Sequence, residues 1–75
     1  MKSYEIVRAI MNAHKIMVNG LARKLGIRPN TLSMRLTSGR DMTVGSMAET
    51  LKAMDYRLVA VPREAALPEG SFEAE

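Results

Sequence analysis

Residues 18–36 of this chain read VNGLARKLGIRPNTLSMRL and contain two short helical patterns that a glycine separates. The first half predicts a helix over residues 18–25, because apolar side chains recur there on one face: Leu21, Ala22 and Leu25. Gly26 then ends this helix, since glycine readily takes the left-handed conformation found at helix ends. Asn19-Gly20 also fits a tight hairpin turn, but its flanks lack the alternation that strands require.

The second half of the stretch predicts another helix, which begins near Pro29 and ends before Ser38-Gly39. Leu32 and Leu36 are four residues apart, so both are expected to face inward. A small residue, Ala22, stands where the two helices would cross, and Leu32 is bulky enough to hold their angle. With a glycine at the turn between them, this spacing predicts a helix-turn-helix unit.

Two further helices are predicted on either side of this unit. Ser3 is the expected N-cap of a helix that ends near His14. The expected apolar face of that helix contains Ile6, Val7, Ile10, Met11 and Ala13. Thr43 is the expected N-cap of a helix that runs to about Met54. Its expected apolar stripe contains Val44, Met47, Ala48, Leu51 and Met54. The predicted fold class is therefore mainly α, with four helices.

Residues 56–61, YRLVAV, break the helical period and are rich in strand formers. One strand cannot satisfy its own backbone N–H and C=O groups, and the sequence offers no second strand. We therefore expect this strand to pair antiparallel with its copy in a second chain, across a two-fold axis. The alternative is an extended arm packed on the helices. The predicted dimerisation residues are Tyr56, Arg57, Leu58, Val59, Ala60 and Val61.

The chain has 75 residues, no cysteine and one histidine. This length suits one domain with a small core, which oligomerisation would stabilise. Disulfides are excluded, and neither a metal site nor a cofactor is predicted. The sequence also lacks paired carboxylates, a phosphate-binding glycine loop and a nucleophile beside a base, so we expect no enzyme activity.

The first ten residues, MKSYEIVRAI, carry charges among their apolar positions, which is unlike a secretory signal. The sequence also has no apolar run close to the roughly 18 residues that span a bilayer. We therefore expect a cytoplasmic protein that makes no membrane contact.

Positive charge is concentrated in the middle of the chain, where residues 15–40 include six basic residues and no acidic one. Residues 1–62 carry ten Lys or Arg and four Asp or Glu, a net charge of +6. Residues 63–75 carry one Arg and four Glu, a net charge of −3. We therefore expect a basic folded domain, 1–62, and an acidic, flexible tail, 63–75. A basic helix pair is typical of nucleic-acid binding.

Residues 21–36, LARKLGIRPNTLSMRL, resemble the core motif of the phage repressor/Cro-type (XRE-like) helix-turn-helix family. Residues 41–61, DMTVGSMAETLKAMDYRLVAV, resemble the next helix and the C-terminal strand of its short members from phages and mobile elements. The resemblance implies a sequence-specific DNA-binding transcriptional repressor that binds a palindromic operator as a homodimer. Arg28 and Pro29 depart from the capping Ser or Thr and the base-reading Gln that are common in the family.

The second helix of the unit is expected to lie in the major groove of double-stranded DNA, with its N-terminal residues at the base edges. The predicted base-reading residues are Arg28, Asn30, Thr31 and Met34. Phosphate contacts are expected on both sides of the groove, where they would set affinity and register. The predicted phosphate-binding residues are Lys15, Val18, Asn19, Ser33, Arg35, Ser38 and Arg40.

Two other functions stay open at the level of the sequence. An antitoxin-like or adaptor module would use the strand or the acidic tail to bind another protein. RNA binding is less favoured, because the three aromatic residues, Tyr4, Tyr56 and Phe72, do not lie beside the basic helices in the sequence.

Overall fold

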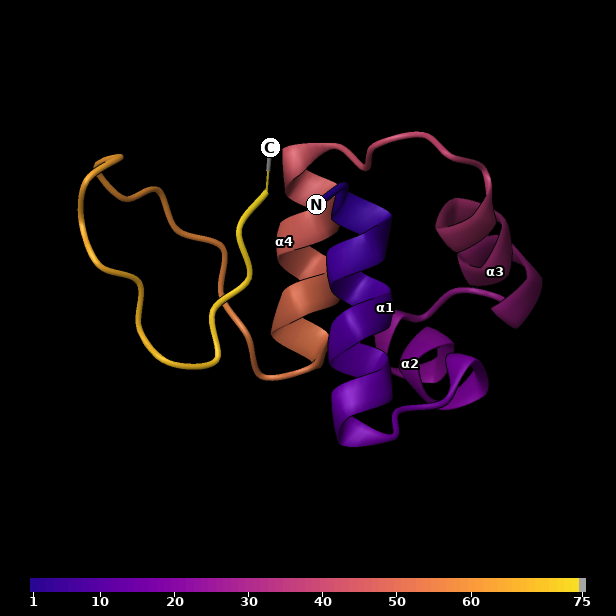
Figure 1. The fold of residues 1–75 in the computed structure, drawn as a ribbon. Helices are drawn as coiled ribbons and strands as arrows, with labels where there is room; N and C mark the ends of the chain where they lie inside the picture. Colours follow the sequence, from indigo (N-terminus) through magenta and orange to yellow (C-terminus); the bar gives the residue numbers. More distant parts are fainter. Residues whose placement is uncertain (75) are drawn as a thin grey trace.

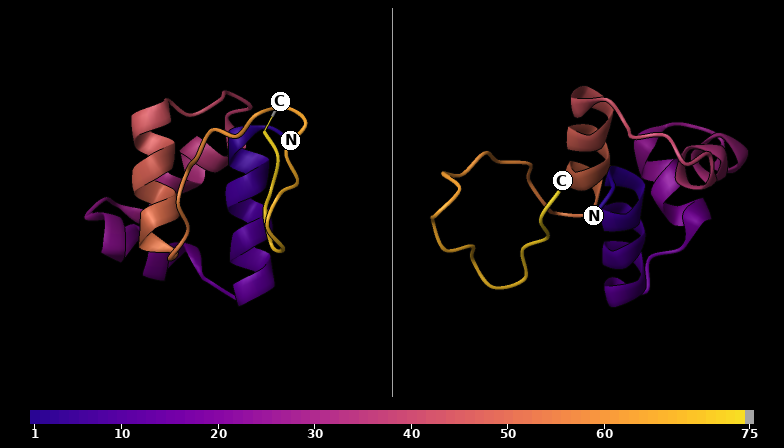
Figure 2. Two further views of the ribbon diagram at one scale, coloured as in Figure 1. Left: turned by 90° about the vertical axis from the view of Figure 1, so that its left-hand side faces the viewer. Right: turned by 45° about the horizontal axis from the view of Figure 1, so that its top comes forward.

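A computed structural model describes residues 1–74, and in that part of the chain it contains four α-helices and no β-strand. In chain order they are α1 (Ser3–His14), α2 (Val18–Leu25), α3 (Pro29–Thr37) and α4 (Val44–Ala53). α1 and α4 run side by side, and α2 and α3 pack against one side of this pair (Figure 1 and Figure 2). The predicted mainly α fold with four helices is confirmed.

One hydrophobic core holds the four helices together, and every helix contributes side chains to it. Its buried members are Ile6, Val7, Ile10, Met11, Leu21, Ala22, Leu32, Leu36, Met47, Leu51 and Met54. Ile10, Leu21 and Leu32 have almost no exposed surface, so the centre of the core lies where α1, α2 and α3 meet. Burial of one such side chain contributes about 1.5–3 kcal/mol to stability. A small domain therefore depends on each of these contacts.

The turn between α2 and α3 has the geometry that the sequence predicts. Gly26 adopts a φ of +70°, in the left-handed region, at the C-terminal end of α2. The backbone N–H of Ile27 donates to the carbonyl of Ala22 at 3.0 Å, which closes the last turn of the helix. Ala22 itself is fully buried, and Leu32 is fully buried in α3. The two helices are thus joined by a tight, hydrogen-bonded turn.

The start of α1 differs from the sequence prediction. Lys2, not Ser3, holds the N-cap position, and its backbone N–H donates to the Glu5 carboxylate at 2.8 Å. Ser3 lies inside the helix, where its hydroxyl donates to Asp41 Oδ1 (3.1 Å) and accepts from the Met42 backbone N–H (2.7 Å). The Ser3 backbone N–H also donates to Asp41 Oδ1, at 3.0 Å. A distant carboxylate, Asp41, therefore adds to the local capping of Lys2 by Glu5.

Two residues of the expected apolar faces are exposed. Ala13 lies at the margin of the buried face of α1, which is centred between Val7 and Ile10. Val44, the first residue of α4, is 76% exposed. Thr50 of the same helix is buried although it is polar. Its hydroxyl donates to the Ser46 carbonyl, so this buried hydroxyl is not left unpaired. The predicted N-cap of α4 is confirmed, because Thr43 Oγ1 accepts from the Ser46 backbone N–H at 3.1 Å.

Residues 56–61 have an irregular conformation in the single chain and do not form a strand there. Beyond them the tail bends away from the helices and then returns toward the N-terminus (Figure 1). Tyr56 connects the helical domain to the tail. Its hydroxyl lies 3.0 Å from Nε2 of His14 in α1, and its ring centroid lies 6.3 Å from that of Phe72 in the tail. The tail is therefore in contact with the helical domain through Phe72, near its end.

The placement of α3 predicts unequal costs for substitutions at two positions that are two residues apart in this helix. Leu32→Ala should lower the free energy of unfolding by about 2–5 kcal/mol, because it leaves a cavity in the core. Met34→Ala should change it by no more than about 0.5 kcal/mol, because that side chain faces solvent. Chemical denaturation followed by circular dichroism measures both. Equal losses would contradict this orientation of the helix.

The Asp41 hydrogen bonds predict a pH-dependent stability. The pKa of Asp41 is lowered from its ordinary value by the backbone N–H and hydroxyl of Ser3 and by the charge of Lys2. Ionised Asp41 therefore stabilises the fold above its unfolded-state pKa, and this contribution is lost as pH falls through the lower, folded-state pKa. Asp41→Asn should lower Tm at pH 7, and its difference from wild type should shrink below about pH 4. A pH-independent difference in thermal melts would contradict this account.

Candidate nucleic-acid interface

One face of α3 points away from the core and carries three of the predicted base-reading residues. Leu32 and Leu36 are buried on the opposite face of the helix. Helical periodicity therefore places Asn30, Thr31 and Met34 together on the outward side, where all three are exposed. Met34 is 69% exposed, which is unusual for a large apolar side chain. This combination of an amide, a hydroxyl and a thioether suits the edges of bases in a groove.

Arg28, the fourth predicted base-reading residue, precedes α3 and caps it in an extended conformation. Its carbonyl accepts the first hydrogen bond of the helix, from the backbone N–H of Leu32. Pro29 follows at the first helical position, where its missing N–H costs nothing. Arg28 is exposed and makes no ion pair within residues 1–74. Arg28 therefore stands, exposed, at the end of α3 where the other predicted base-reading residues begin.

The start of α2 carries two of the predicted phosphate-binding residues. Its N-cap, Met17, has an extended backbone and offers no side-chain acceptor. The first backbone hydrogen bond of the helix runs from Leu21 to the Met17 carbonyl, at 3.0 Å. The N–H groups of Val18 and Asn19 are therefore not capped by a side chain. Unpaired N–H groups and the helix dipole both favour an anion at such a position.

The remaining predicted phosphate-binding residues lie on two sides of α3, and not all are equally available. Lys15 ends α1 in a left-handed conformation with a φ of +54°, and Arg40 lies in the α3–α4 connection at the opposite end of the domain (Figure 1). Arg35 is exposed on α3. Ser38 is engaged locally, because its Oγ accepts from the Arg40 backbone N–H at 3.3 Å. Ser33 is half-buried, and its backbone carbonyl accepts from the hydroxyl of Thr37, one turn later in α3.

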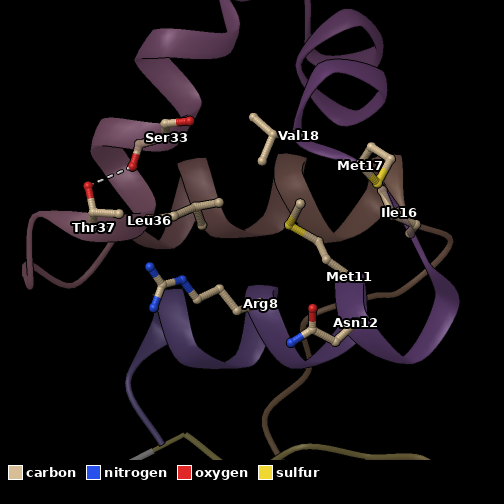
Figure 3. Close-up of a pocket in the computed structure, with 9 residues that line it drawn as sticks. All are labelled: Arg8, Met11, Asn12, Ile16, Met17, Val18, Ser33, Leu36 and Thr37. Atoms are coloured by element: carbon tan, nitrogen blue, oxygen red, sulfur yellow. Dashed lines mark hydrogen bonds between the residues drawn. The ribbon is translucent and has the colours of Figure 1, made fainter.

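An open groove of about 440 Å³ lies between α1, the start of α2 and the second half of α3 (Figure 3). Its lining residues are Arg8, Met11, Asn12, Ile16, Met17, Val18, Ser33, Leu36 and Thr37. Figure 3 shows the Arg8 guanidinium extending from α1 toward α3, and this group has no hydrogen-bond or ion-pair partner within the described residues. The groove thus combines an unpaired cation with the uncapped start of α2.

Arg8 is a candidate residue that the sequence reasoning missed. It lies outside the acid-free stretch, in a helix that also contains Glu5, so charge alone did not single it out. Its helical spacing from Met11, three residues later, places it beside the buried face of α1. Helical periodicity in α1 was thus the signal that could have placed Arg8 next to a buried residue, and so next to a neighbouring helix.

Negative charge is absent from the helix-turn-helix unit and belongs to other parts of the chain, with Glu49 of α4 beside Lys24 of α2. No acidic residue belongs to α2, α3 or the turn between them. Asp41, the acidic residue next to Arg40, is held by Ser3 and forms an ion pair with Lys2 at 3.7 Å. The glutamates of the tail leave the domain on the side of α4 that is remote from α3 (Figure 1 and Figure 2). The helix-turn-helix unit itself therefore carries only basic charges.

Comparison with known proteins adds no relative to these observations. No family model, no curated protein and no solved structure matches this chain. The similarity of residues 21–36 to phage repressors thus stays a prediction from the sequence. Within residues 1–74, no helix is long and apolar enough to cross a membrane, and no group of three acidic, histidine or cysteine side chains could hold a metal ion.

Proposed function

We propose that this protein is a sequence-specific DNA-binding regulator of transcription, which binds a palindromic operator as a homodimer and acts as a repressor. The observation that carries the proposal is the outward face of α3. Its exposed amide, hydroxyl and thioether groups belong to residues 15–40, a stretch of the chain that has six basic residues and no acidic one. The repressor role rests on the resemblance of the helix-turn-helix residues to phage repressors.

In this proposal, α3 lies in the major groove with its N-terminal half at the base edges. Asn30 bonds adenine through both atoms of its amide, and Arg28 pairs with guanine. Thr31 and Met34 contact thymine methyl groups. The exposure of all four side chains supports these roles, since none has to leave the core to reach a base.

Phosphate contacts on two sides of α3 would fix its position in the groove. On one side are the start of α2, Lys15 and the newly identified Arg8. Arg40 lies on the other side, and Arg35 is on α3 itself. The hydrogen bond from the Arg40 backbone to Ser38 supports this role, because it restrains the loop that carries the guanidinium.

The dimer is proposed to form through residues 56–61. The backbone N–H and C=O groups of residues 57–61 have no hydrogen-bond partner within residues 1–74, so they are available to another chain. Leu58, Val59 and Val61 are exposed apolar residues in the same segment. Antiparallel pairing of two copies would bury these side chains and satisfy the backbone groups together.

Substitutions on α3 and beside it should affect DNA binding in two different ways. Asn30→Ala should lose about 1–3 kcal/mol of preference for a selected site over an unrelated duplex. Arg8→Ala and Arg40→Ala should weaken binding to both duplexes alike, and each should reduce the slope of log affinity against log salt by about 0.9. Fluorescence anisotropy titrations at several salt concentrations measure both effects.

Arg63→Ala is the matched control for these arginine variants. It removes the same side chain from the tail, on the side of the molecule remote from α3 (Figure 1). Because salt screens charges beyond about 10 Å, both affinities should stay within about twofold of wild type. If Arg63→Ala weakened binding as much as Arg40→Ala, net charge rather than a defined surface would account for the affinity.

Pairing of residues 56–61 should be sensitive to proline. Val59→Pro removes a backbone donor from the middle of the segment and should convert dimer to monomer in sedimentation equilibrium. Ala66→Pro, in the tail, should leave the dimer intact. Val59→Pro should also weaken binding to a two-half-site duplex more than to a single half-site. A Val59→Pro protein that stays dimeric would place the interface elsewhere.

Selection of bound sequences from a random DNA pool tests the proposal as a whole. The expected site is two-fold symmetric, with half-sites about one helical turn, 34–36 Å, apart. Absence of any enriched site would overturn the proposed function. The protein-binding alternative, in which the acidic tail contacts another protein, would then be favoured. Its support is the exposed Leu67 among the tail glutamates.

A further inference from the structure

The seven methionines of the chain are unequally distributed between core and surface. Met11, Met47 and Met54 are each 6% exposed and belong to the core. Met17 is 74% exposed and Met34 is 69% exposed, more than any other methionine of the described chain. Exposed thioethers are the ones that dissolved oxidants reach first.

Both of these exposed methionines lie on the helix-turn-helix side of the molecule. Met17 is the N-cap of α2 and borders the groove whose other wall includes Ser33 and Thr37 of α3 (Figure 3). Met34 follows Ser33 in α3 and stands at the centre of the outward face, opposite the buried Leu32. The two most exposed methionine side chains of the described residues therefore lie on the surface proposed to contact DNA.

We propose that Met34, together with Met17, is an oxidation site through which peroxide lowers the DNA affinity of this protein. This inference rests on the proposed function. In the reaction, the thioether sulfur attacks one oxygen of hydrogen peroxide, an S–O bond forms and the O–O bond breaks. Hydroxide leaves and takes the proton of the transferred oxygen, giving water. Sulfur loses two electrons and peroxide gains two.

The sulfoxide is a polar group with a partial negative charge on oxygen, where the thioether was apolar. At Met34 it replaces the contact proposed with a thymine methyl group, so preference for the selected site falls. At Met17 the sulfoxide lies beside the uncapped start of α2, where a phosphate of DNA is proposed to bind. Its oxygen therefore repels the DNA phosphate. Methionine sulfoxide reductases reverse the modification, which makes the loss of affinity recoverable.

Oxidation of these two residues is not expected to unfold the domain. Neither side chain is part of the buried core. The core methionines are shielded from the oxidant as long as the fold is intact. The effect on DNA binding is thus separable from an effect on stability.

The experiment treats the full chain with limiting hydrogen peroxide and locates each sulfoxide by peptide mass spectrometry. Affinity for the selected DNA site is measured before treatment, after treatment and after incubation with sulfoxide reductases. Oxidation at Met17 and Met34 should lower affinity about tenfold, the scale of one lost base contact. The reductases should restore it, and the circular dichroism spectrum should stay unchanged.

The double variant Met17→Leu/Met34→Leu supplies the control, since leucine is apolar and cannot form a sulfoxide. The quantity compared is the ratio of affinities before and after peroxide, so the starting affinity of the variant does not matter. This ratio should fall to near one. A tenfold loss that persists in the double variant would overturn the inference, as would full oxidation of Met17 and Met34 in wild type without loss of affinity.

A loss of helicity that accompanies the loss of affinity would also overturn the inference, because unfolding would then explain it. Absence of DNA binding before any treatment would overturn the proposed function and this inference with it. That failure is distinct from DNA binding that is present but insensitive to peroxide.

Discussion

The packing of α2 against α3, with Ala22 fully buried, is the constraint on which the rest of the structure depends. A larger side chain there would force the helices apart, because Ala22, Leu21 and Leu32 are all fully buried. Gly26 lets the chain reverse directly after α2 in a left-handed conformation that costs other residues roughly 1 kcal/mol or more. This packing and the turn together fix which face of α3 is buried. The outward face, with Asn30 at its start, is thereby fixed as well.

A second constraint acts from a distance. Asp41 Oδ1 accepts from both the backbone N–H and the hydroxyl of Ser3, so the α3–α4 connection is tied to the start of α1. Arg40 is the residue before Asp41, and its position therefore depends on α1 as well as on α3. The ion pair with Lys2 also partly offsets the negative charge of Asp41 beside Arg40. One carboxylate thus ties the α3–α4 connection, and with it Arg40, to the first helix.

The sequence predicted local features well and distant ones poorly. The bounds of α2, the left-handed Gly26 and the Thr43 cap were predictable, because each depends on residues within four positions. The role of Ser3 was not, since its partner Asp41 is 38 residues away. The exposure of Val44 depends on how α4 is rotated against its neighbours. Arg8 joins the candidate surface only through the packing of α1 against α3.

The position of residues 56–61 makes the proposed dimer compatible with the proposed DNA contact. This segment leaves the domain after α4, on the side remote from α3 (Figure 1). Two copies joined there would leave both outward faces of α3 uncovered. The tails would follow the paired segments and keep their negative charge away from the phosphates, where it would oppose binding. The chain has a basic domain followed by an acidic tail, and the fold places these two parts apart. The surface proposed for DNA is thereby separated from the segment proposed to pair with the second chain.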